Sequence, residues 1–314
     1  MNMNNVDFKN LQVDKENEEV EYNDAIHKYW TKKGMNPCIS VTTLIHRFST
    51  FDEYFWSRYK ALESMLGIEG FKPVKPYLLE NKIFNEEILH DLGIEVEDFN
   101  EEVDSILKEW EEKRERACER GTKIHKDYEL KTLASDYSPL GDYDVPKFFE
   151  GGSFKLDTSN KIQEGNYVLP ELLLSRVSED GVLRIAGQAD LIIISGDEVY
   201  ILDYKTNKEI KTKSFFDRKK RSSAKMQYPL NNLDDVNYFH YEMQLSTYAW
   251  MIEKNNPKLK VKGLFLLHHD HSDKKTVYKC EYRKTDVERM LVFYKKELER
   301  QQHKQRNTKW GWTK

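Results

Sequence analysis

One β-hairpin in the middle of the chain most constrains its fold. Residues 183–194 have the composition of a strand, 195–198 (Ser-Gly-Asp-Glu) that of a tight turn, and 199–204 that of a returning strand rich in β-forming side chains. Residues 199–202 are apolar on both sides of the strand, as in a central strand that is covered on both faces. The hairpin therefore predicts a sheet with other layers packed against it.

Three charged residues stand at the end of this hairpin. Side chains alternate along a strand, so Asp203 and Lys205 point the same way, and the neighbouring strand brings Asp190 beside them. Carboxylates are hard oxygen ligands suited to Mg²⁺ or Mn²⁺, and a lysine beside them can orient a water or neutralise charge on a phosphate. We interpret the three residues as a site for cutting phosphodiesters. A structural salt bridge inside the hairpin is the alternative, although burying charges without a purpose is costly.

A long helix is predicted upstream of the hairpin. Residues 110–129 are dense in helix formers and contain no proline. Gly121, His125 and Glu129 recur every four residues, so one face of the helix carries a small residue, a histidine and a carboxylate in turn. Such a face can approach a sheet closely. A lone helical histidine can equally be a satisfied surface or core residue.

A second helix is predicted downstream, over residues 241–252, and the Asn-Asn-Pro run at 255–257 stops it. Most of its apolar side chains fit an amphipathic helix packed against the sheet. Gln244 and Tyr248 share one face of this helix. Core packing alone leaves the polar Gln244 unexplained.

The order of these motifs resembles the RecB-like branch of the PD-(D/E)XK nuclease superfamily, which includes phage-type and mitochondrial single-strand exonucleases. The family pattern runs Gly-x-x-x-His, Gly-x-x-Asp, Asp/Glu-x-Lys and Gln-x-x-x-Tyr, and this chain supplies the four motifs at 121–125, 187–190, 203–205 and 244–248. The resemblance extends over about residues 36–268. It implies an α/β fold (α+β, mixed sheet), in which a restriction-endonuclease-like core has a central mixed sheet flanked by helices, plus an N-terminal helical elaboration.

The resemblance also implies catalytic roles for the residues at the motif positions. His125, Asp190 and Asp203 would ligate the metal, with the backbone carbonyl of Tyr204 as a further ligand. Lys205 would serve the attacking water or the transition state. The cofactor would be Mg²⁺ or Mn²⁺.

Four further residues are candidates for supporting roles. By the resemblance, Gln244 would touch the DNA backbone or hold the catalytic lysine, and Tyr248 would pack beneath it or meet a base. Glu129 would fix the orientation of the histidine one turn before it. Glu171 looks like the extra acidic ligand of some relatives, and its alternative is a strand-edge carboxylate that faces water.

The charge of the chain is polarised, although its formal net value is -4. Residues 205–225 hold nine Lys or Arg against two acids, residues 80–112 hold thirteen acids against two lysines, and residues 300–314 hold five Lys or Arg with two tryptophans. Basic segments with aromatics suit a phosphate backbone and unpaired bases, so we expect single-stranded DNA or DNA with free ends as the partner. A lysine-rich loop with incidental charge is the alternative. The candidate DNA-binding residues are Lys208, Lys211, Lys213, Arg218, Lys219, Lys220 and Arg221.

Cofactors other than a divalent metal are not expected. Cys38, Cys118 and Cys280 are too few for the four-cysteine iron-sulfur cluster of some relatives, and their spacing predicts no disulfide framework or Cys-x-x-Cys zinc site. The chain lacks a Gly-x-x-x-x-Gly-Lys-Ser/Thr loop, so no nucleotide cofactor is expected. The His-His-Asp-His run at 268–271 has the residue types of a zinc site, but consecutive strand residues face opposite ways, and we interpret it as a polar hairpin end.

The chain is predicted to have five segments. Residues 1–24 form a flexible N-terminus, 25–135 a helical region that includes the histidine-bearing helix, 136–164 an irregular excursion, 165–302 the nuclease core, and 303–314 a basic tail. No apolar run approaches the length of a membrane span, and the start lacks a signal-peptide core, so no membrane partner is expected. We expect a cytoplasmic protein, in the host cytoplasm if a phage encodes it.

The helical region offers one further expectation. It contains a short predicted strand at 39–41 and an aromatic stretch at 51–62. In related exonucleases the N-terminal helices help to form an arch or channel for a DNA strand, and residues 51–62 would contribute to it. The alternative is ordinary aromatic core packing.

Taken together, the sequence predicts a metal-dependent DNA exonuclease that acts on single strands or DNA ends in replication, recombination or phage DNA metabolism. Replication or recombination proteins are possible partners. One alternative is a structure-selective endonuclease on the same fold. The other is a DNA-binding component that has kept the fold without hydrolysis.

Overall fold

The computed structural model describes residues 20–23, 26–32, 34–133, 166–214, 216–217 and 222–310. The chain divides into two compact units, of which the smaller is Phe51–Thr122 and the larger comprises Met1–Thr50 and Lys123–Lys314. None of the helices in the described ranges is long and apolar enough to cross a membrane.

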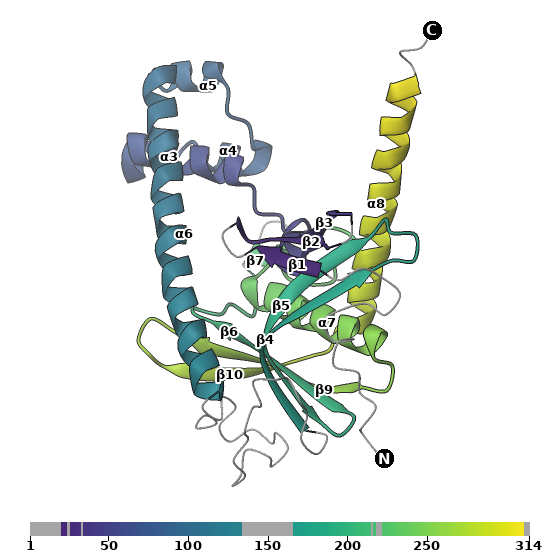
Figure 1. Ribbon diagram of the computed structural model, residues 1–314. Helices are drawn as coiled ribbons and strands as arrows, with labels where there is room; N and C mark the ends of the chain where they lie inside the picture. Colours follow the sequence, from purple (N-terminus) through teal and green to yellow (C-terminus); the bar gives the residue numbers. More distant parts are fainter. Residues whose placement is uncertain are drawn as a thin grey trace. The chain divides into compact units, whose positions relative to one another are not determined.

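The larger unit is built on a mixed eight-stranded sheet (Figure 1). Its strands follow the order β1-β2-β3-β5-β6-β9-β10, and β4 pairs with β5. The pairs β3–β5 and β6–β9 are parallel, and the other pairs are antiparallel. The strands are β1 (Val20–Asn23), β2 (Lys28–Thr31), β3 (Pro37–Ser40), β4 (Asn166–Val177), β5 (Arg184–Ser195), β6 (Glu198–Lys205), β9 (Lys260–His269) and β10 (Lys275–Cys280), with a separate small pair β7 (Phe216–Asp217) and β8 (Ser222–Ser223).

The predicted hairpin is confirmed as β5 and β6. The two strands pair from Leu191↔Leu202 to Ser195↔Glu198, and Gly196 takes a φ of 65° in the turn between them. Such a left-handed backbone favours glycine because an added Cβ would crowd the neighbouring carbonyl. The predicted mixed sheet with flanking helices is therefore present.

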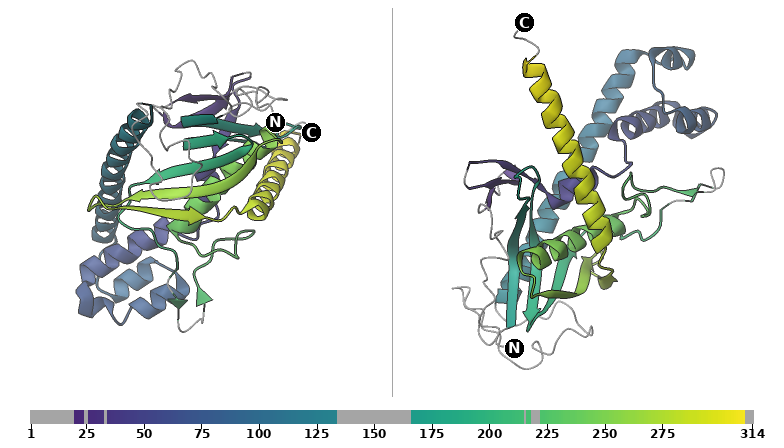
Figure 2. Two further views of the ribbon diagram at one scale, coloured as in Figure 1. Left: turned by 90° about the horizontal axis from the view of Figure 1, so that it is seen from below. Right: turned by 90° about the vertical axis from the view of Figure 1, so that its right-hand side faces the viewer.

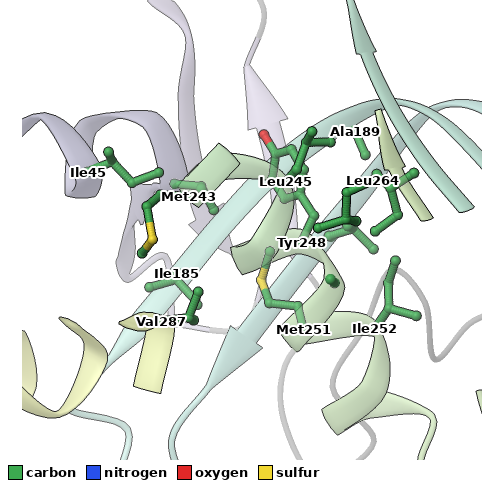
Figure 3. Packing of buried hydrophobic residues seen from close by; sticks show 14 of the residues in the cluster. Ile45, Ile185, Ala189, Met243, Leu245, Tyr248, Met251, Ile252, Leu264 and Val287 are labelled. Atoms are coloured by element: carbon green, nitrogen blue, oxygen red, sulfur yellow. The ribbon is translucent and has the colours of Figure 1, made fainter. Parts of the chain in front are cut away.

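Helices cover both faces of this sheet. On one face, α7 (Asn237–Asn255) and α8 (Lys284–Trp310) pack with the short α2 (Val41–His46), as Figure 2 shows for α7 and α8. Figure 3 shows Tyr248 and Ile252 of α7 beside Leu264 of β9. On the other face, Ile124 and Tyr128 of α6 (Val96–Leu133) pack on residues of β5, β6 and β9.

The predicted helices exist but are longer than the sequence indicated. The helix predicted over 110–129 is part of α6, the helix predicted over 241–252 is α7, and both extend beyond the predicted bounds at each end. The strand predicted at 39–41 is wrong at its end, because Val41 begins α2 and Ser40 caps that helix by accepting a hydrogen bond from the Thr43 amide.

Two strands at the N-terminal edge of the sheet were not predicted. The β2 strand pairs with both β1 and β3, and its Tyr29 side chain is buried. The three strands are four residues each, so their hydrophobic alternation is too short to distinguish from that of a loop or a helix end. Their pairing and the burial of Tyr29 identify them as strands, although their sequences are short.

The alternation of side chains slips by one residue in both β4 and β5. Ala189 and Ile192 both belong to the core on the α7 face, although two residues separate them where regular alternation would place one or three. Leu169 and Leu172 repeat this spacing in β4. Glu171 lies at the slip in β4 with a φ of 50°, which costs a non-glycine residue about 1–2 kcal/mol. Because both strands slip opposite each other, the pairing register is unchanged on either side.

The smaller unit is helical, as the N-terminal elaboration was predicted to be. It consists of α3 (Glu53–Phe71), α4 (Lys75–Asn81), α5 (Glu86–Asp91) and the first part of α6. Phe55 and Tyr59 lie almost fully buried in its own core. For these two aromatics the structure favours core packing, the alternative to a channel lining.

At Gly187, β5 and α7 approach each other closely. A Cβ built on Gly187 would lie 2.7 Å from Cε1 of Tyr248, well inside van der Waals contact. We expect Gly187→Ala to reduce the free energy of unfolding by about 1–3 kcal/mol, because the buried tyrosine ring must shift. Urea denaturation measures the loss.

The matched control removes the ring. The variant Gly187→Ala with Tyr248→Leu should lose less stability than the sum of the two single variants, since the added methyl then meets no aromatic carbon. If the stability losses of the two single variants simply add in the double variant, this result would contradict a direct clash between these positions.

Candidate active site

The candidate site forms where the backbone pairing of β5 and β6 stops. The ladder ends at Leu191↔Leu202, and beyond it the Tyr204 amide donates instead to Oδ2 of Asp190 at 2.5 Å. The carboxylate thus replaces a strand as the hydrogen-bond partner of a buried amide. Toward its start, β5 pairs on this edge with β3, through Ile185 and Ala186. The Asp190 side chain therefore lies in the interval between β3 and β6, the two strands that pair with the same edge of β5.

Three side chains from different elements meet at this interval. His125 of α6, Glu171 of β4 and Asp190 of β5 each offer a ligand atom, and these atoms all lie within 4.8 Å of one another. His125 Nδ1 is 3.5 Å from Asp190 Oδ1, and His125 Nε2 donates to the Tyr204 carbonyl at 3.1 Å. One imidazole, two carboxylates and a nearby carbonyl form a donor set suited to a divalent cation. The left-handed backbone of Glu171 places its carboxylate in this group.

A second group surrounds the Lys205 ammonium. Lys205 Nζ lies 2.5 Å from Oδ2 of Asp203 and donates to Oε1 of Gln244 at 3.2 Å. Gln244 Nε2 in turn lies within hydrogen-bond distance of Asp203 Oδ1 (3.3 Å) and of the Tyr248 hydroxyl (3.1 Å). The amide of Gln244 therefore fixes the ion pair from the α7 side. Of its two predicted roles, the structure brings Gln244 to the lysine.

Tyr241 completes this group and was missed by the sequence analysis. Lys205 Nζ lies 4.5 Å from the centroid of the Tyr241 ring, the geometry of a cation–π contact. Tyr241, Gln244 and Tyr248 are spaced i, i+3, i+7, so they lie on one face of α7. This spacing could have indicated Tyr241 from the sequence. It was missed because Tyr241 was taken as the first residue of the predicted helix, where a common face is hard to recognise.

Burial and charge together shift the pKa values of the site. Burial alone would lower the pKa of His125, but the Asp190 and Asp203 carboxylates outweigh it and raise this pKa to about 9. Burial, and then the Asp190 carboxylate, raise the pKa of Glu171 to about 8. Burial raises the pKa of Asp203 to about 6 despite its lysine partner. Without a metal, His125 and Glu171 therefore carry protons at neutral pH, and a cation that binds to them must displace these protons.

Asp190 and Lys205 are shifted toward their charged forms. Burial opposes charge on Asp190, yet the His125 imidazole and the lysine lower the pKa of this carboxyl below its usual value. Burial likewise opposes charge on Lys205, and the Asp203 and Asp190 carboxylates raise the pKa of the ammonium above its usual value. A protonated lysine can stabilise negative charge but cannot accept a proton.

The remaining candidate residues are placed in different ways. Tyr248 is buried against Gly187, beneath Gln244, which favours the packing role over contact with a base. Glu129 accepts a hydrogen bond from Lys126 at 2.7 Å, and its orienting role toward the histidine stays a prediction. Lys208, Lys211 and Lys213 are exposed, and Arg218, Lys219, Lys220 and Arg221 lie outside the described residues.

The His-His-Asp-His run has the divergent arrangement expected of a hairpin end. His268 Nε2 lies 2.7 Å from the Asn207 carbonyl, whereas His269 contacts the Tyr128 hydroxyl and Asp273. Asp270 accepts hydrogen bonds from Ser272 and Lys274 within the β9–β10 turn. Among the described residues, the group able to hold a metal is the one at His125, and this run does not form another.

A sequence model described as the PD-(D/E)XK nuclease superfamily matches residues 82–310 of the chain. The chain belongs to this superfamily. The matched range includes the Gly187–Asp190 and Asp203–Lys205 motifs together with His125 and Gln244. A nuclease of this superfamily acts on nucleic acid, and its members typically use divalent metals, which agrees with the donor set at the interval between β3 and β6.

Other comparisons give only distant neighbours. The crystal structure of SSO0001 matches with 20% identity and a TM-score of 0.25, over 42% of this chain and 50% of that chain. The match thus spans about half of the SSO0001 chain. The crystal structure of a "Putative exonuclease" from Eubacterium rectale matches with 11% identity and a TM-score of 0.31, over 84% of this chain and 79% of that one. No curated protein sequence matches the chain.

The pKa shifts predict that the stabilisation of the protein by Mg²⁺ depends on pH. In the protein without metal, the raised pKa of His125 (6.5 to about 9) contributes stability below pH 6.5 that is lost as the pH rises through 9. The raised pKa of Glu171 (4.5 to about 8) acts in the same direction, because the folded state holds this proton more tightly than the unfolded state. We therefore expect Mg²⁺ to raise the Tm more at about pH 8.5 than at about pH 6.5.

Thermal denaturation with Mg²⁺ or with a chelator at both pH values measures this difference. The variant His125→Ala should lose most of the Mg²⁺ effect. The matched control His271→Ala, at an exposed histidine of the β9–β10 turn, should keep it. An equal Mg²⁺ effect at both pH values in the wild type would contradict proton displacement at this group.

Proposed function

We propose that this protein is a Mg²⁺- or Mn²⁺-dependent DNA exonuclease of the RecB-like branch, acting on single strands or DNA ends. The observation that carries the proposal is the Lys205 ammonium, held by Asp203, Gln244 and Tyr241 next to the donor group of His125, Glu171 and Asp190. Membership of the nuclease superfamily supports it. A structural salt bridge explains the Asp203–Lys205 pair, but not the separate donor group beside it.

The proposed reaction is hydrolysis of a phosphodiester. A divalent ion at the donor group would polarise the scissile phosphate and lower the pKa of an attacking water. Water adds to phosphorus and gives up one proton to solvent, the bond from phosphorus to the 3′ oxygen breaks, and the leaving oxygen takes up one proton from solvent, giving a 5′-phosphate and a 3′-hydroxyl. Lys205 stays protonated, so its role is to orient the water through a hydrogen bond and to offset negative charge on the phosphorane-like transition state.

The surrounding residues would serve this lysine and the ligands. Gln244 holds the ammonium and one oxygen of Asp203 at once, so it fixes the direction of both groups. Asp203 is the nearest carboxylate to the lysine, and we propose that it turns one oxygen toward the metal when DNA binds. The Tyr204 carbonyl, 3.1 Å from His125 Nε2, is a further oxygen ligand in this proposal.

The substrate part of the proposal rests on charge. Lys208, Lys211 and Lys213 follow the catalytic strand directly and are exposed. A backbone of phosphates would be attracted to this segment, with an affinity that falls as salt is added. An endonuclease on the same fold would use the same chemistry, and a binding component would use the same basic segment without hydrolysis.

Replacing the lysine tests the proposal. We expect Lys205→Ala to reduce the rate of DNA hydrolysis by about 10²–10³-fold, because the transition state loses its positioned ammonium. The matched control Lys258→Ala, at an exposed lysine in the turn after α7, should retain the wild-type rate. Linear DNA labelled separately at each end, with Mg²⁺, Mn²⁺ or a chelator, gives the rate and the polarity of digestion.

Circular substrates separate the alternatives. An exonuclease leaves circular single-stranded DNA intact, whereas an endonuclease cuts it. Metal-independent binding without cleavage of any substrate by the wild type would overturn the catalytic proposal and leave a DNA-binding component.

Tyr241 offers a separate prediction about catalysis. A cation–π contact of this kind is worth about 0.5–2 kcal/mol. We expect Tyr241→Leu to lower kcat about tenfold with little change in KM or Tm, because the ammonium loses one of its three supports. Tyr241→Phe keeps the ring and should be close to wild type. Equal losses in the two variants would show that the hydroxyl, and not the ring face, matters.

A further inference from the structure

The smaller unit concentrates two unusual properties in one place. Residues Phe51–Thr122 contain 19 Asp or Glu and 10 Lys or Arg, a net charge of -9, so the rest of the chain carries +5 of the total of -4. Of twelve exposed large hydrophobic residues in the described ranges, seven belong to this unit. They are Phe51, Tyr54, Met65, Ile68, Tyr77, Leu79 and Ile83.

The unit also has a hollow of about 360 Å³ between α4 and α5. Its apolar walls are Val74 and Tyr77 on one side and Ile88 and Leu92 on the other, and Tyr77 is 49% exposed. The polar side chains that line it are Asn85, Glu87 and Asp91. The lining of the hollow thus combines four apolar side chains with two carboxylates and one amide, and it contains no basic side chain.

Across residues 72–92 three lysines stand against four acids, so the acidic character is local to the lining of the hollow. Lys72, Lys75 and Lys82 lie near the hollow in sequence, but none of them lines it. The ammonium of Lys82 lies 5.4 Å from the centroid of the Phe55 ring. The lining therefore presents carboxylates as its charged groups.

Charge disfavours nucleic acid as the natural occupant of this surface. A unit with an excess of nine carboxylates repels a phosphate backbone, whereas exposed apolar side chains rimmed by charge are typical of protein interfaces. We propose that the hollow between α4 and α5 docks a basic, amphipathic segment of a partner protein, with apolar side chains in the hollow and Lys or Arg beside Glu87 and Asp91. This inference does not depend on the proposed nuclease reaction.

A synthetic peptide tests the proposal on the full chain. The probe is an amphipathic helix of roughly four turns, with leucine and tryptophan on one face and lysine on the other. Fluorescence anisotropy should show saturable binding that weakens as salt increases. Peptides with glutamate in place of lysine, or serine in place of the apolar residues, should bind at least about tenfold more weakly. Equal binding of the lysine peptide without apolar residues would overturn the proposal, since simple charge attraction would then suffice.

Variants place the binding at the hollow. The double variant Glu87→Lys with Asp91→Lys should weaken the lysine peptide by at least about tenfold, and Tyr77→Ser should weaken it while leaving the salt dependence unchanged. The matched control Glu101→Lys with Asp104→Lys makes the same charge change at exposed positions of α6 and should alter binding less than about threefold. An equal effect of both double variants would overturn the proposed location.

Two other occupants are outcomes of the same experiment. If a peptide of residues 300–314, the basic tail with two tryptophans, binds more tightly than the designed peptide, the occupant is a second copy of this chain and the partner proposal is overturned. If single-stranded DNA competes for the peptide and its competition depends on Glu87 and Asp91, the surface binds nucleic acid and the proposal is again overturned. Nuclease activity of the Glu87 and Asp91 variants is a separate readout and should stay at the wild-type rate.

Discussion

The candidate site depends on one hydrogen bond, from the Tyr204 amide to the Asp190 carboxylate. A central β-hairpin normally continues its backbone ladder to the ends of both strands, and here the ladder stops at Leu191 and Leu202. A buried amide without a partner costs about 1–3 kcal/mol, so the strands can separate only because a side chain accepts the bond. The same carboxylate then lies beside the imidazole of His125. One carboxyl group therefore meets both contacts, with Oδ2 toward the amide and Oδ1 toward the imidazole.

The separation of the strands also explains why so much charge can be buried. Asp190, Asp203 and Lys205 would be costly in a closed sheet, and each is hydrogen-bonded or ion-paired where the strands diverge. The two groups adjoin each other but involve different helices. One offers ligands and faces the α6 side, and the other holds an ammonium from the α7 side. The Tyr204 backbone links them, because its amide contacts one ligand and its carbonyl another.

The residues that could be placed together from the sequence are those whose spacing is fixed by regular secondary structure. Asp203 and Lys205 lie two apart on a strand, and Gln244 and Tyr248 lie four apart on a helix, so their common faces follow from periodicity. Features that depend on contacts distant in sequence could not be predicted in this way. The short β1 strand pairs with β2, β2 pairs with β3, and the slip at Glu171 lies opposite a matching slip in β5. Tyr241 was visible in the periodicity, but only the structure shows the lysine above its ring.

The left-handed backbone of Glu171 has a consequence for how this protein can diverge. Asparagine or glycine would occupy that conformation with less strain, yet neither would supply a carboxylate at the donor group. Under the proposed function, selection for the ligand and selection for an unstrained backbone therefore oppose each other at a single position. In lineages that keep the fold but no longer need the ligand, this opposition disappears. Position 171 would then drift toward small or amide side chains earlier than the buried residues around it.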